Sequence, residues 1–290
     1  MWWRIAIAWL ACIVPAVAQD AVQRGAYLVH AGGCASCHTM PGGAPFAGGR
    51  ALETPFGTFY SPNITPDAET GIGRWTDAQF QHALREGRRP DGASYFPVFP
   101  YPSFTSITDA DALAIKAYLF SLPPVRQANR AHDVAFPFSW RFLQTAWRLL
   151  FFREGPFRAD PSRDGVYNRG AYLVTALGHC GECHTPRNVL GAVKPSLALA
   201  GTRDGPDGQT VPNITPDRTS GIGDWDAADI VTLLKTGRTP EQSAVKGAMR
   251  EVVQDGLKML SDADLQAIAA YLLAQQPTAS VAGSAARPSR

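Results

Sequence analysis

Apolar positions recur along this chain with the three-to-four-residue spacing of short helices, and no useful stretch alternates with the period of two that marks a strand. Helix starts of the capping type, with Thr, Ser or Asp followed three residues later by Gln or Asp, occur at Thr76, Thr108, Asp226 and Ser261. Gly87 and Gly237 are typical C-terminal stops for the helices that begin at Thr76 and Asp226. The pattern predicts an all-α fold with almost no sheet.

The same pattern occurs twice. Identical or nearly identical segments follow one another in the same order, and besides a cysteine motif they are Arg24–Val29 with Arg169–Val174, Asn63–Asp67 with Asn213–Asp217, Gly71–Trp75 with Gly221–Trp225, and Asp109–Asp111 with Asp262–Asp264. A series of matches in one order indicates duplication of a whole domain. We therefore predict one domain over residues 19–125, called the first copy, and another over residues 163–276, called the second copy.

A connector of residues 126–162 separates the copies. Within it, an apolar stripe at helical spacing consists of Phe136, Trp140, Leu143, Trp147 and Leu150, and a polar face consists of Arg141, Gln144, Thr145 and Arg148. The favoured interpretation is an amphipathic helix whose apolar stripe packs across both domains. The alternative is contact of residues 136–153 with a membrane surface or a protein partner, because Trp and Phe opposite Arg are typical of an interfacial helix.

The two ends of the chain differ from the repeat. Residues 1–18 combine Arg4, an apolar run and the sequence Ala16-Val17-Ala18, which predicts a secretory signal peptide cut after Ala18. The run is shorter than the about 20 apolar residues that span a bilayer, and a lipid anchor on Cys12 fits its flanking residues poorly. Export predicts a periplasmic, oxidising location. The small, polar residues 277–290 predict a disordered tail.

Composition adds two constraints. The 27 glycines and 23 prolines imply long loops, so the core of each small domain needs additional apolar bulk, which a cofactor can supply. The formal net charge of +2 is close to neutral, and Lys and Arg are spread along the chain. We therefore expect no nucleic-acid partner.

The cysteines supply the chemistry. Cys34-Ala-Ser-Cys37-His38 and Cys180-Gly-Glu-Cys183-His184 are two Cys-x-x-Cys-His motifs. Two thiols at this spacing can each add to a vinyl group of one haem, and the following His becomes the proximal ligand of the iron. A zinc site, a thioredoxin-like pair and a structural disulfide are the competing interpretations. Two copies in an exported helical repeat favour two covalently attached haem c groups, with His38 and His184 as proximal ligands.

The sixth ligand of the second iron is predicted to be Met249, in the loop ahead of the last helix. A methionine at that position raises the reduction potential. The alternative is a methionine that only fills space in the core. Met259 is the one rival in that half of the chain, and it stands just before the cap of the final helix.

The first copy lacks this methionine. The offset of 150 residues between the Asn63 and Asn213 loops places Phe99 opposite Met249, and phenylalanine cannot ligate iron. Met40 follows His38 too closely to reach the other side of the haem. We expect the first iron to be five-coordinate or water-bound, or to recruit a histidine, with His132 as the first choice and His82 as the second. Each outcome lowers the potential of the first haem relative to His/Met ligation. Two further histidines, His30 and His179, are predicted to be local hydrogen-bonding residues.

The motifs resemble those of a known family. Arg24–Val29, Pro55–Asp67, Pro100–Phe104 and Gly178–Arg187 are similar to segments of the multihaem cytochrome c subunit of periplasmic alcohol, gluconate and sugar dehydrogenases. The resemblance covers nearly the whole chain after residue 18, and it implies two tandem class I-like cytochrome c domains. Members of that family usually have three haems and a methionine where Phe99 stands. This sequence has two motifs, so it resembles a dihaem variant.

The resemblance implies an electron-transfer subunit, located in the periplasm or peripherally on the inner membrane, without catalytic residues of its own. It would accept electrons from a dehydrogenase partner and pass them to a quinone, a cytochrome or a terminal oxidase. The alternative function is a dihaem oxidoreductase of the thiosulfate dehydrogenase or peroxidase type that uses an open first haem. A haem-based sensor is a third hypothesis, but no output domain is recognisable.

Overall fold

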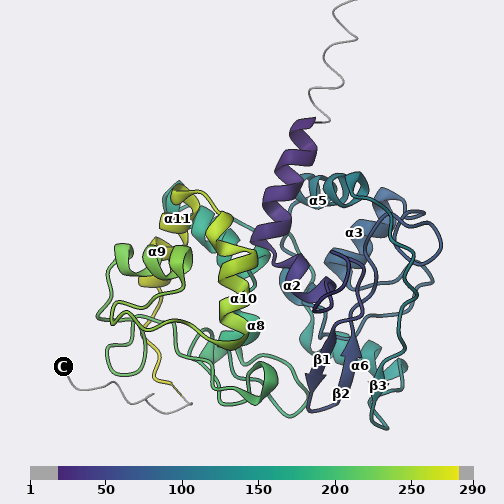
Figure 1. Ribbon diagram of the computed structural model, residues 1–290. Coiled ribbons are helices and arrows are strands. Elements are labelled where there is room, and N and C mark those ends of the chain that lie inside the picture. Colours follow the sequence, from purple (N-terminus) through teal and green to yellow (C-terminus); the bar gives the residue numbers. More distant parts are fainter. Residues whose placement is uncertain (1–18, 281–290) are drawn as a thin grey trace, which may run out of the picture.

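The computed structural model describes residues 19–280 and shows two groups of short helices, one from each copy of the repeat (Figure 1). In the first copy a helix over residues 19–31 precedes four further helices: α2 (Cys34–His38), α3 (Asp77–Glu86), α4 (Tyr101–Phe104) and α5 (Asp109–Ser121). The second copy contains α7 (Gly165–Tyr172), α8 (Gly181–His184), α9 (Ala227–Thr236), α10 (Gly247–Asp255) and α11 (Asp262–Leu273), with a short turn of helix, η4 (Leu257–Met259), before the last. Residues 1–18, the predicted signal peptide, lie outside the described residues.

The predicted caps are confirmed. The side chains of Thr76 and Asp226 each accept a hydrogen bond from the backbone N–H of the third helical residue, and the side chain of that residue accepts one from the backbone N–H of the cap. The hydroxyl groups of Thr108 and Ser261 cap α5 and α11 by accepting from the backbone N–H of Asp111 and Asp264, without the reciprocal bond. The helices α3 and α9 end at glycines in the left-handed conformation, as the sequence indicates.

A small sheet corrects the all-α prediction. Strands β1 (Ala51–Thr54) and β2 (Gly57–Tyr60) form an antiparallel hairpin, and β3 (Asp133–Val134) from the connector pairs with β2. The approach of β3 depends on Gly57, because a Cβ there would lie 2.3 Å from the carbonyl oxygen of Asp133. In the second copy this region contains two short 3-10 turns instead, η2 (Pro195–Leu197) and η3 (Pro206–Gly208). The fold is therefore helix-rich with a small sheet.

The helix before the second cysteine motif contains one extra residue. The second copy is one residue longer than the first between the Arg-Gly-Ala-Tyr-Leu-Val segment and the cysteines. A π-helical turn, η1 (Leu173–Leu177), follows α7 directly at that point. A π-bulge is the usual way in which a helix absorbs a single inserted residue. The segments before and after the inserted residue therefore keep the same positions in the second copy as in the first.

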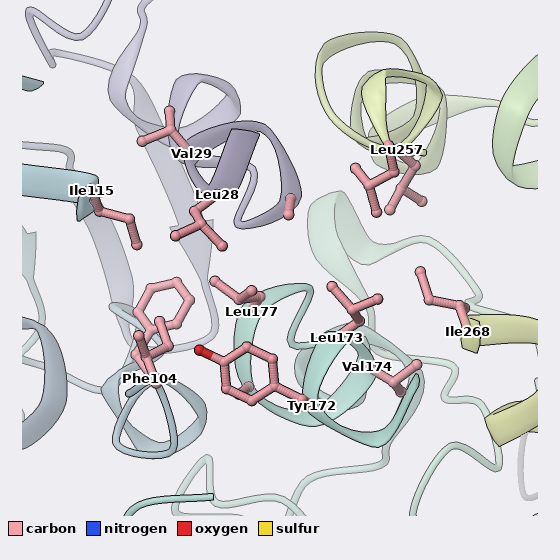
Figure 2. Packing of buried hydrophobic residues seen from close by; sticks show 14 of the residues in the cluster. Leu28, Val29, Phe104, Ile115, Tyr172, Leu173, Val174, Leu177, Leu257 and Ile268 are labelled. Carbon is pink, nitrogen blue, oxygen red and sulfur yellow. The ribbon is translucent and has the colours of Figure 1, made fainter. Parts of the chain in front are cut away.

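The two copies share one hydrophobic core. Leu28 and Phe104 of the first copy lie beside Leu177 and Tyr172 of the second in Figure 2, and all four side chains are buried. The helices of each copy also pack closely on each other, because Gly25 faces α5 and Gly170 faces α11. A Cβ on either glycine would come within 1.9 Å of a carbonyl oxygen of the neighbouring helix.

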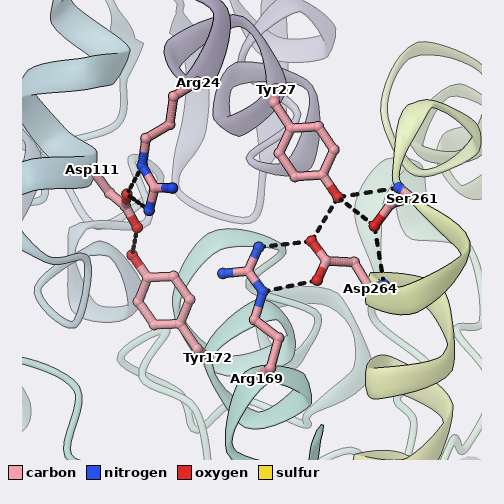
Figure 3. A network of polar contacts seen from close by, with 7 residues as sticks. All are labelled: Arg24, Tyr27, Asp111, Arg169, Tyr172, Ser261 and Asp264. Carbon is pink, nitrogen blue, oxygen red and sulfur yellow. Dashed lines mark hydrogen bonds and ion pairs between the residues drawn. The ribbon is translucent and has the colours of Figure 1, made fainter. Parts of the chain in front are cut away.

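A polar clasp joins the copies on one side of this core (Figure 3). Nε of Arg24 donates to Oδ1 of Asp111 at 2.8 Å, within the first copy. The hydroxyl of Tyr172 in the second copy donates to Oδ2 of the same carboxylate at 2.6 Å. The cap residue Thr108 adds a backbone N–H to the tyrosine oxygen at 3.3 Å. Asp111 thus holds an arginine of its own copy and a tyrosine of the other.

The equivalent residues form a second clasp with the roles of the copies exchanged. Arg169 donates two hydrogen bonds to Asp264, at 2.8 and 2.7 Å, within the second copy. Tyr27 of the first copy donates to Oδ2 of Asp264 at 2.6 Å, and the backbone N–H of Ser261 donates to the tyrosine oxygen at 3.1 Å. The pair of clasps links the copies reciprocally, through residues of the repeated segments Arg24–Val29 and Arg169–Val174.

The connector helix α6 (Phe142–Phe151) is oriented only in part as the favoured interpretation predicts. It contacts both copies, since Arg148 donates to the carbonyl of Glu86 and Trp147 donates to the carbonyl of Leu190 at 2.9 Å. Of the predicted polar face, however, Gln144 is buried and Arg148 is half-buried, while Arg141 and Thr145 are exposed. Leu143 and Trp147 of the predicted apolar stripe are half-buried. Large apolar residues of residues 136–150 are exposed instead: Phe136, Trp140, Phe142, Leu149 and Leu150. The inward face suits arginine because the Arg148 guanidinium lies over the rings of Tyr101 and Phe152.

The end of the described chain is attached to the second copy. Asn213 donates to the carbonyl of Thr278 at 2.7 Å, and Ser280 donates its N–H to Ser220 at 3.0 Å. The first few residues of the tail that the composition predicts to be disordered are therefore held by hydrogen bonds, and residues 281–290 lie outside the described residues. Within residues 19–280, no helix is both long and apolar enough to cross a bilayer.

Candidate haem-binding sites

The four cysteines of the two motifs lie on short helical turns with their thiols unpaired. In each motif one helical turn carries both thiols and the histidine, because the spacing Cys-x-x-Cys returns to the same face after about 3.6 residues. Burial raises the pKa of Cys34 and of Cys180 to about 12. Burial thus favours the neutral thiol, and none of these four cysteines is in a disulfide in the structure.

The histidines of the motifs are held in the tautomer that a haem iron requires. Nδ1 of His38 lies 2.8 Å from the carbonyl oxygen of Pro62, and Nδ1 of His184 lies 2.8 Å from that of Pro212. A carbonyl can only accept, so Nδ1 carries the proton and Nε2 keeps its lone pair for a metal. Burial also lowers the pKa of both imidazoles, which favours the neutral form. Two thiols and one free Nε2 per motif fit covalently attached haem.

The carbonyls that orient the histidines belong to the repeated Asn-Ile-Thr-Pro-Asp loops. Asn63 follows Pro62, accepts from the N–H of Thr65 at 2.9 Å and donates to the carbonyl of Val125 at 2.7 Å. Asn213 makes the corresponding bonds in the second copy, at 2.8 Å to Thr215 and 2.7 Å to Thr278. Both asparagines are buried. These loops have a function that motif reading missed, although their repetition in the sequence was a signal for it.

Met249 lies on α10 and not in a loop, which corrects the predicted position. The helix begins at Gly247, whose φ of +54° turns the chain into it, and the Met249 side chain is half-buried against the core. Met259, the rival, is 52% exposed. Between the two, Met249 is the methionine placed toward the interior of the second copy.

Phe99 is the residue of the first copy that aligns with Met249 of the second. The backbone supports the alignment, because the N–H of Tyr95 bonds to the carbonyl of Gly87 and the N–H of Val245 bonds to that of Gly237, both at 2.8 Å. The Phe99 ring packs edge-on against Phe104, with ring centroids 5.8 Å apart. The distal segment of the first copy is thus aromatic where that of the second has a thioether.

The two histidines considered for the first iron have other partners. Nδ1 of His132 accepts the backbone N–H of Tyr60 at 3.2 Å, so the proton of the neutral ring is on Nε2. A protonated Nε2 has no free lone pair, so ligation of the first iron by His132 would require loss of that proton or of the Tyr60 contact. His82 pairs with Glu86 along α3, and its side chain is 56% exposed. Met40 is also exposed.

His30 and His179 form hydrogen bonds, as predicted, but their partners lie in the other copy. Nδ1 of His30 lies 3.0 Å from the carbonyl oxygen of Asp255, and Nε2 of His179 lies 3.4 Å from that of Gly32. Glu182, inside the second motif, accepts from the hydroxyl of Ser103 at 2.7 Å. Each cysteine motif is therefore in contact with the other copy. No spacing in the sequence indicates these contacts.

Comparison with known proteins agrees with this geometry. The cytochrome c family model matches residues 22–123, which is most of the first copy. A diheme cytochrome c-type of Cereibacter sphaeroides is 44% identical over 261 residues, which cover 86% of this chain and 84% of the relative. The gluconate 2-dehydrogenase cytochrome c subunit of Pantoea cypripedii is 42% identical over 88% of this chain.

The relatives differ in length. The chain spans 60% of the gluconate dehydrogenase subunit and 22% of a nicotinate dehydrogenase subunit of Pseudomonas putida, to which it is 44% identical over 91% of its own length. The matching region therefore occurs both in proteins of this size and as part of larger ones. The chain belongs to the c-type cytochrome family that includes the diheme protein and the cytochrome c subunits of gluconate, alcohol and fructose dehydrogenases, a family that binds haem covalently.

Proposed function

We propose that the chain is a dihaem electron-transfer protein built from two tandem cytochrome c domains. One haem is attached through Cys34 and Cys37 with His38 as proximal ligand, and the other through Cys180 and Cys183 with His184. The observation that supports this most directly is the equal environment of the two histidines, whose Nδ1 atoms each lie 2.8 Å from a proline carbonyl. Haem supplies the one-electron chemistry, and the residues of the chain fix its orientation and its potential.

The test is the intact mass of the protein purified after export. We expect the mass of the polypeptide from Gln19 onward plus two haem groups. The double variant Cys180→Ala/Cys183→Ala should lose one haem increment and keep the other. A single increment on the unaltered chain, or zinc in place of iron, would contradict the proposal.

The partner follows from the relatives. Because several of them are cytochrome subunits of dehydrogenases, we propose a periplasmic dehydrogenase as electron donor and a quinone, a cytochrome or a terminal oxidase as acceptor. With Met249 on the second iron and Phe99 near the first, the first haem has the lower potential, so electrons enter at the first copy and leave from the second. Copurification from a periplasmic extract should identify a dehydrogenase. Recovery of the protein without any redox partner would contradict this assignment.

The exposed apolar face of residues 136–150 is the surface that we propose for the dehydrogenase. An interfacial membrane helix needs cations free to contact lipid phosphates. Here Arg141, Arg148 and Arg153 all donate to backbone carbonyls of the protein itself. The double variant Phe142→Ser/Leu149→Ser should weaken binding of the dehydrogenase, with unchanged haem spectra. Unchanged dehydrogenase binding together with lost affinity for anionic phospholipid vesicles would show that the face binds membrane instead.

A further inference from the structure

The helix that carries Met249 is attached to the cysteine motif of the other copy. Helix α10 packs against α2, which contains Cys34 and Cys37. Nη2 of Arg50, from the first copy, lies 2.8 Å from Oε2 of Glu251. Glu251 is two positions after Met249 on the same helix, so this ion pair fixes the turn that presents the thioether.

The C-terminal end of α10 is fixed by a second contact with the first copy. Nδ1 of His30 donates to the carbonyl of Asp255, the last residue of the helix, at 3.0 Å. Such a bond satisfies one of the carbonyls that a helix leaves unpaired at its end. The chain then turns at Gly256, where a Cβ would lie 2.7 Å from the carbonyl oxygen of His30. Only glycine permits this approach without a shift of the backbone.

The second copy supports this helix through η4, α9 and the buried Val253, but it leaves the entry to the helix exposed. The segment before it is exposed over residues 241–244, and α10 enters from Gly247 in the left-handed conformation. The half-buried Met249 side chain therefore depends for its position on a helix that is anchored at its middle and its end by the other copy. A ligand is effective only when the element that carries it is held within a fraction of an ångström.

We propose that Arg50 and His30, both in the first copy, are positioning residues for Met249 at the second haem. Residues on either side of the first cysteine motif thereby position the sixth ligand of the second haem. This inference rests on the proposed function, in which Met249 ligates the second iron. It adds a link between the two sites that runs through protein contacts and not through the haem groups.

The experiment compares Arg50→Gln with Arg250→Gln in the full-length holoprotein. Arg250 is exposed and is the neighbour of Glu251, so it is a matched control for the loss of one positive charge. The measurements are the methionine-to-iron charge-transfer absorbance and the equilibrium binding of imidazole to the ferric protein. Met249→Ala identifies which part of each signal belongs to the second haem. A partly exposed ion pair contributes a modest amount, so Arg50→Gln should increase imidazole binding at the second haem about two- to fivefold.

Salt provides a measurement that needs no variant. Because salt screens a partly exposed ion pair, raising the ionic strength should increase imidazole binding to the unaltered protein and to Arg250→Gln, and should have little effect on Arg50→Gln or Glu251→Gln. His30→Ala should also increase binding. Its effect should add to that of Arg50→Gln in the double variant, because the two residues hold different parts of α10.

The outcomes separate the two proposals. If Met249→Ala leaves the absorbance band and imidazole binding unchanged, then Met249 is not the ligand and the inference falls with its premise. If Met249→Ala acts but Arg50→Gln matches Arg250→Gln, the ligand assignment stands and the inference is overturned. A lower melting temperature of Arg50→Gln with unchanged imidazole binding would also overturn it, because Arg50 would then only stabilise the fold.

Discussion

The two copies of the repeat are nearly the same around the proximal histidines and differ most in the distal segment. On the proximal side, the same loop places a proline carbonyl 2.8 Å from Nδ1 in each copy. On the distal side, the first copy has the four-residue helix α4 preceded by Phe99, and the second has the nine-residue helix α10 with Met249. The copies thus share the loop that orients the motif histidine and differ in the segment that we propose to supply the sixth ligand.

The largest expected effect is at Met249. Replacing it with Ala removes the soft ligand that favours reduced iron, so the potential of the second haem should fall by on the order of 0.1 V or more, within the roughly 0.8 V range that axial ligands cover. A spectroelectrochemical titration that resolves both haems measures this. The first haem should be unaffected, and two unchanged midpoints would show that the copies do not differ in the way proposed.

Phe99→Met tests the same difference between the copies by introducing a methionine into the first copy. If the Phe99 position lies over the first iron, the new thioether should raise the potential of the first haem toward that of the second, and a second methionine-to-iron absorbance band should develop. Phe104→Met, at the last residue of α4, is the control and should leave the potential unchanged. Two haems of equal, high potential in the unaltered protein would contradict the alignment of Phe99 with Met249.

The clasps should have a moderate effect on stability. Tyr172→Phe removes one hydroxyl from a buried carboxylate, Asp111, and hydrogen bonds to charged groups contribute about 1.5–3 kcal/mol. Tyr27→Phe should cost less, because that clasp is more exposed. Urea unfolding monitored by haem absorbance gives the values. Tyr118→Phe, on the same helix as Asp111, is the control, and a loss as large as that of Tyr172→Phe would contradict the proposed stabilising effect of the clasp.

Acid should weaken the second clasp by a smaller amount. Burial raises the pKa of Asp264, but hydrogen bonds from Arg169 and Tyr27 outweigh it and leave the pKa below its ordinary value of about 4. A carboxylate with a lowered folded-state pKa contributes stability above its unfolded-state pKa, and that stability is lost as the pH falls through the folded-state value. Melting temperatures between pH 6 and 3 should therefore converge for the unaltered protein and Asp264→Asn as the pH falls, and a constant difference would contradict this.

Much of the site was predictable because it depends on local chemistry. The capping residues, the glycine stops and the cysteine motifs each form within one or two turns of chain, so the residues alone indicate them. The inserted residue before Cys180 was also visible as a change in the spacing between the two copies. The sequence did not show that a π-helical turn would absorb it.

The connector could not be predicted in the same way. The rule that an apolar stripe faces the core assumes that the core offers an apolar surface, whereas α6 meets aromatic faces and unpaired carbonyls that bind arginine. Its Arg148 and Gln144 therefore turn inward. The histidine contacts with the other copy were also hidden, because His30 and Asp255 are distant in the chain and nothing in the repeat links them.

Each copy contributes a tyrosine, Tyr27 or Tyr172, to the clasp of the other copy, and this exchange gives the molecule an internal symmetry. In both clasps an aspartate pairs with an arginine of its own half and a tyrosine of the other, which is the arrangement that two identical subunits adopt about a twofold axis. The two halves therefore have the reciprocal geometry of a homodimer with a twofold axis, although they belong to one chain. Because both halves are parts of one chain, a residue can differ between them without loss of this symmetric contact, as Phe99 and Met249 do.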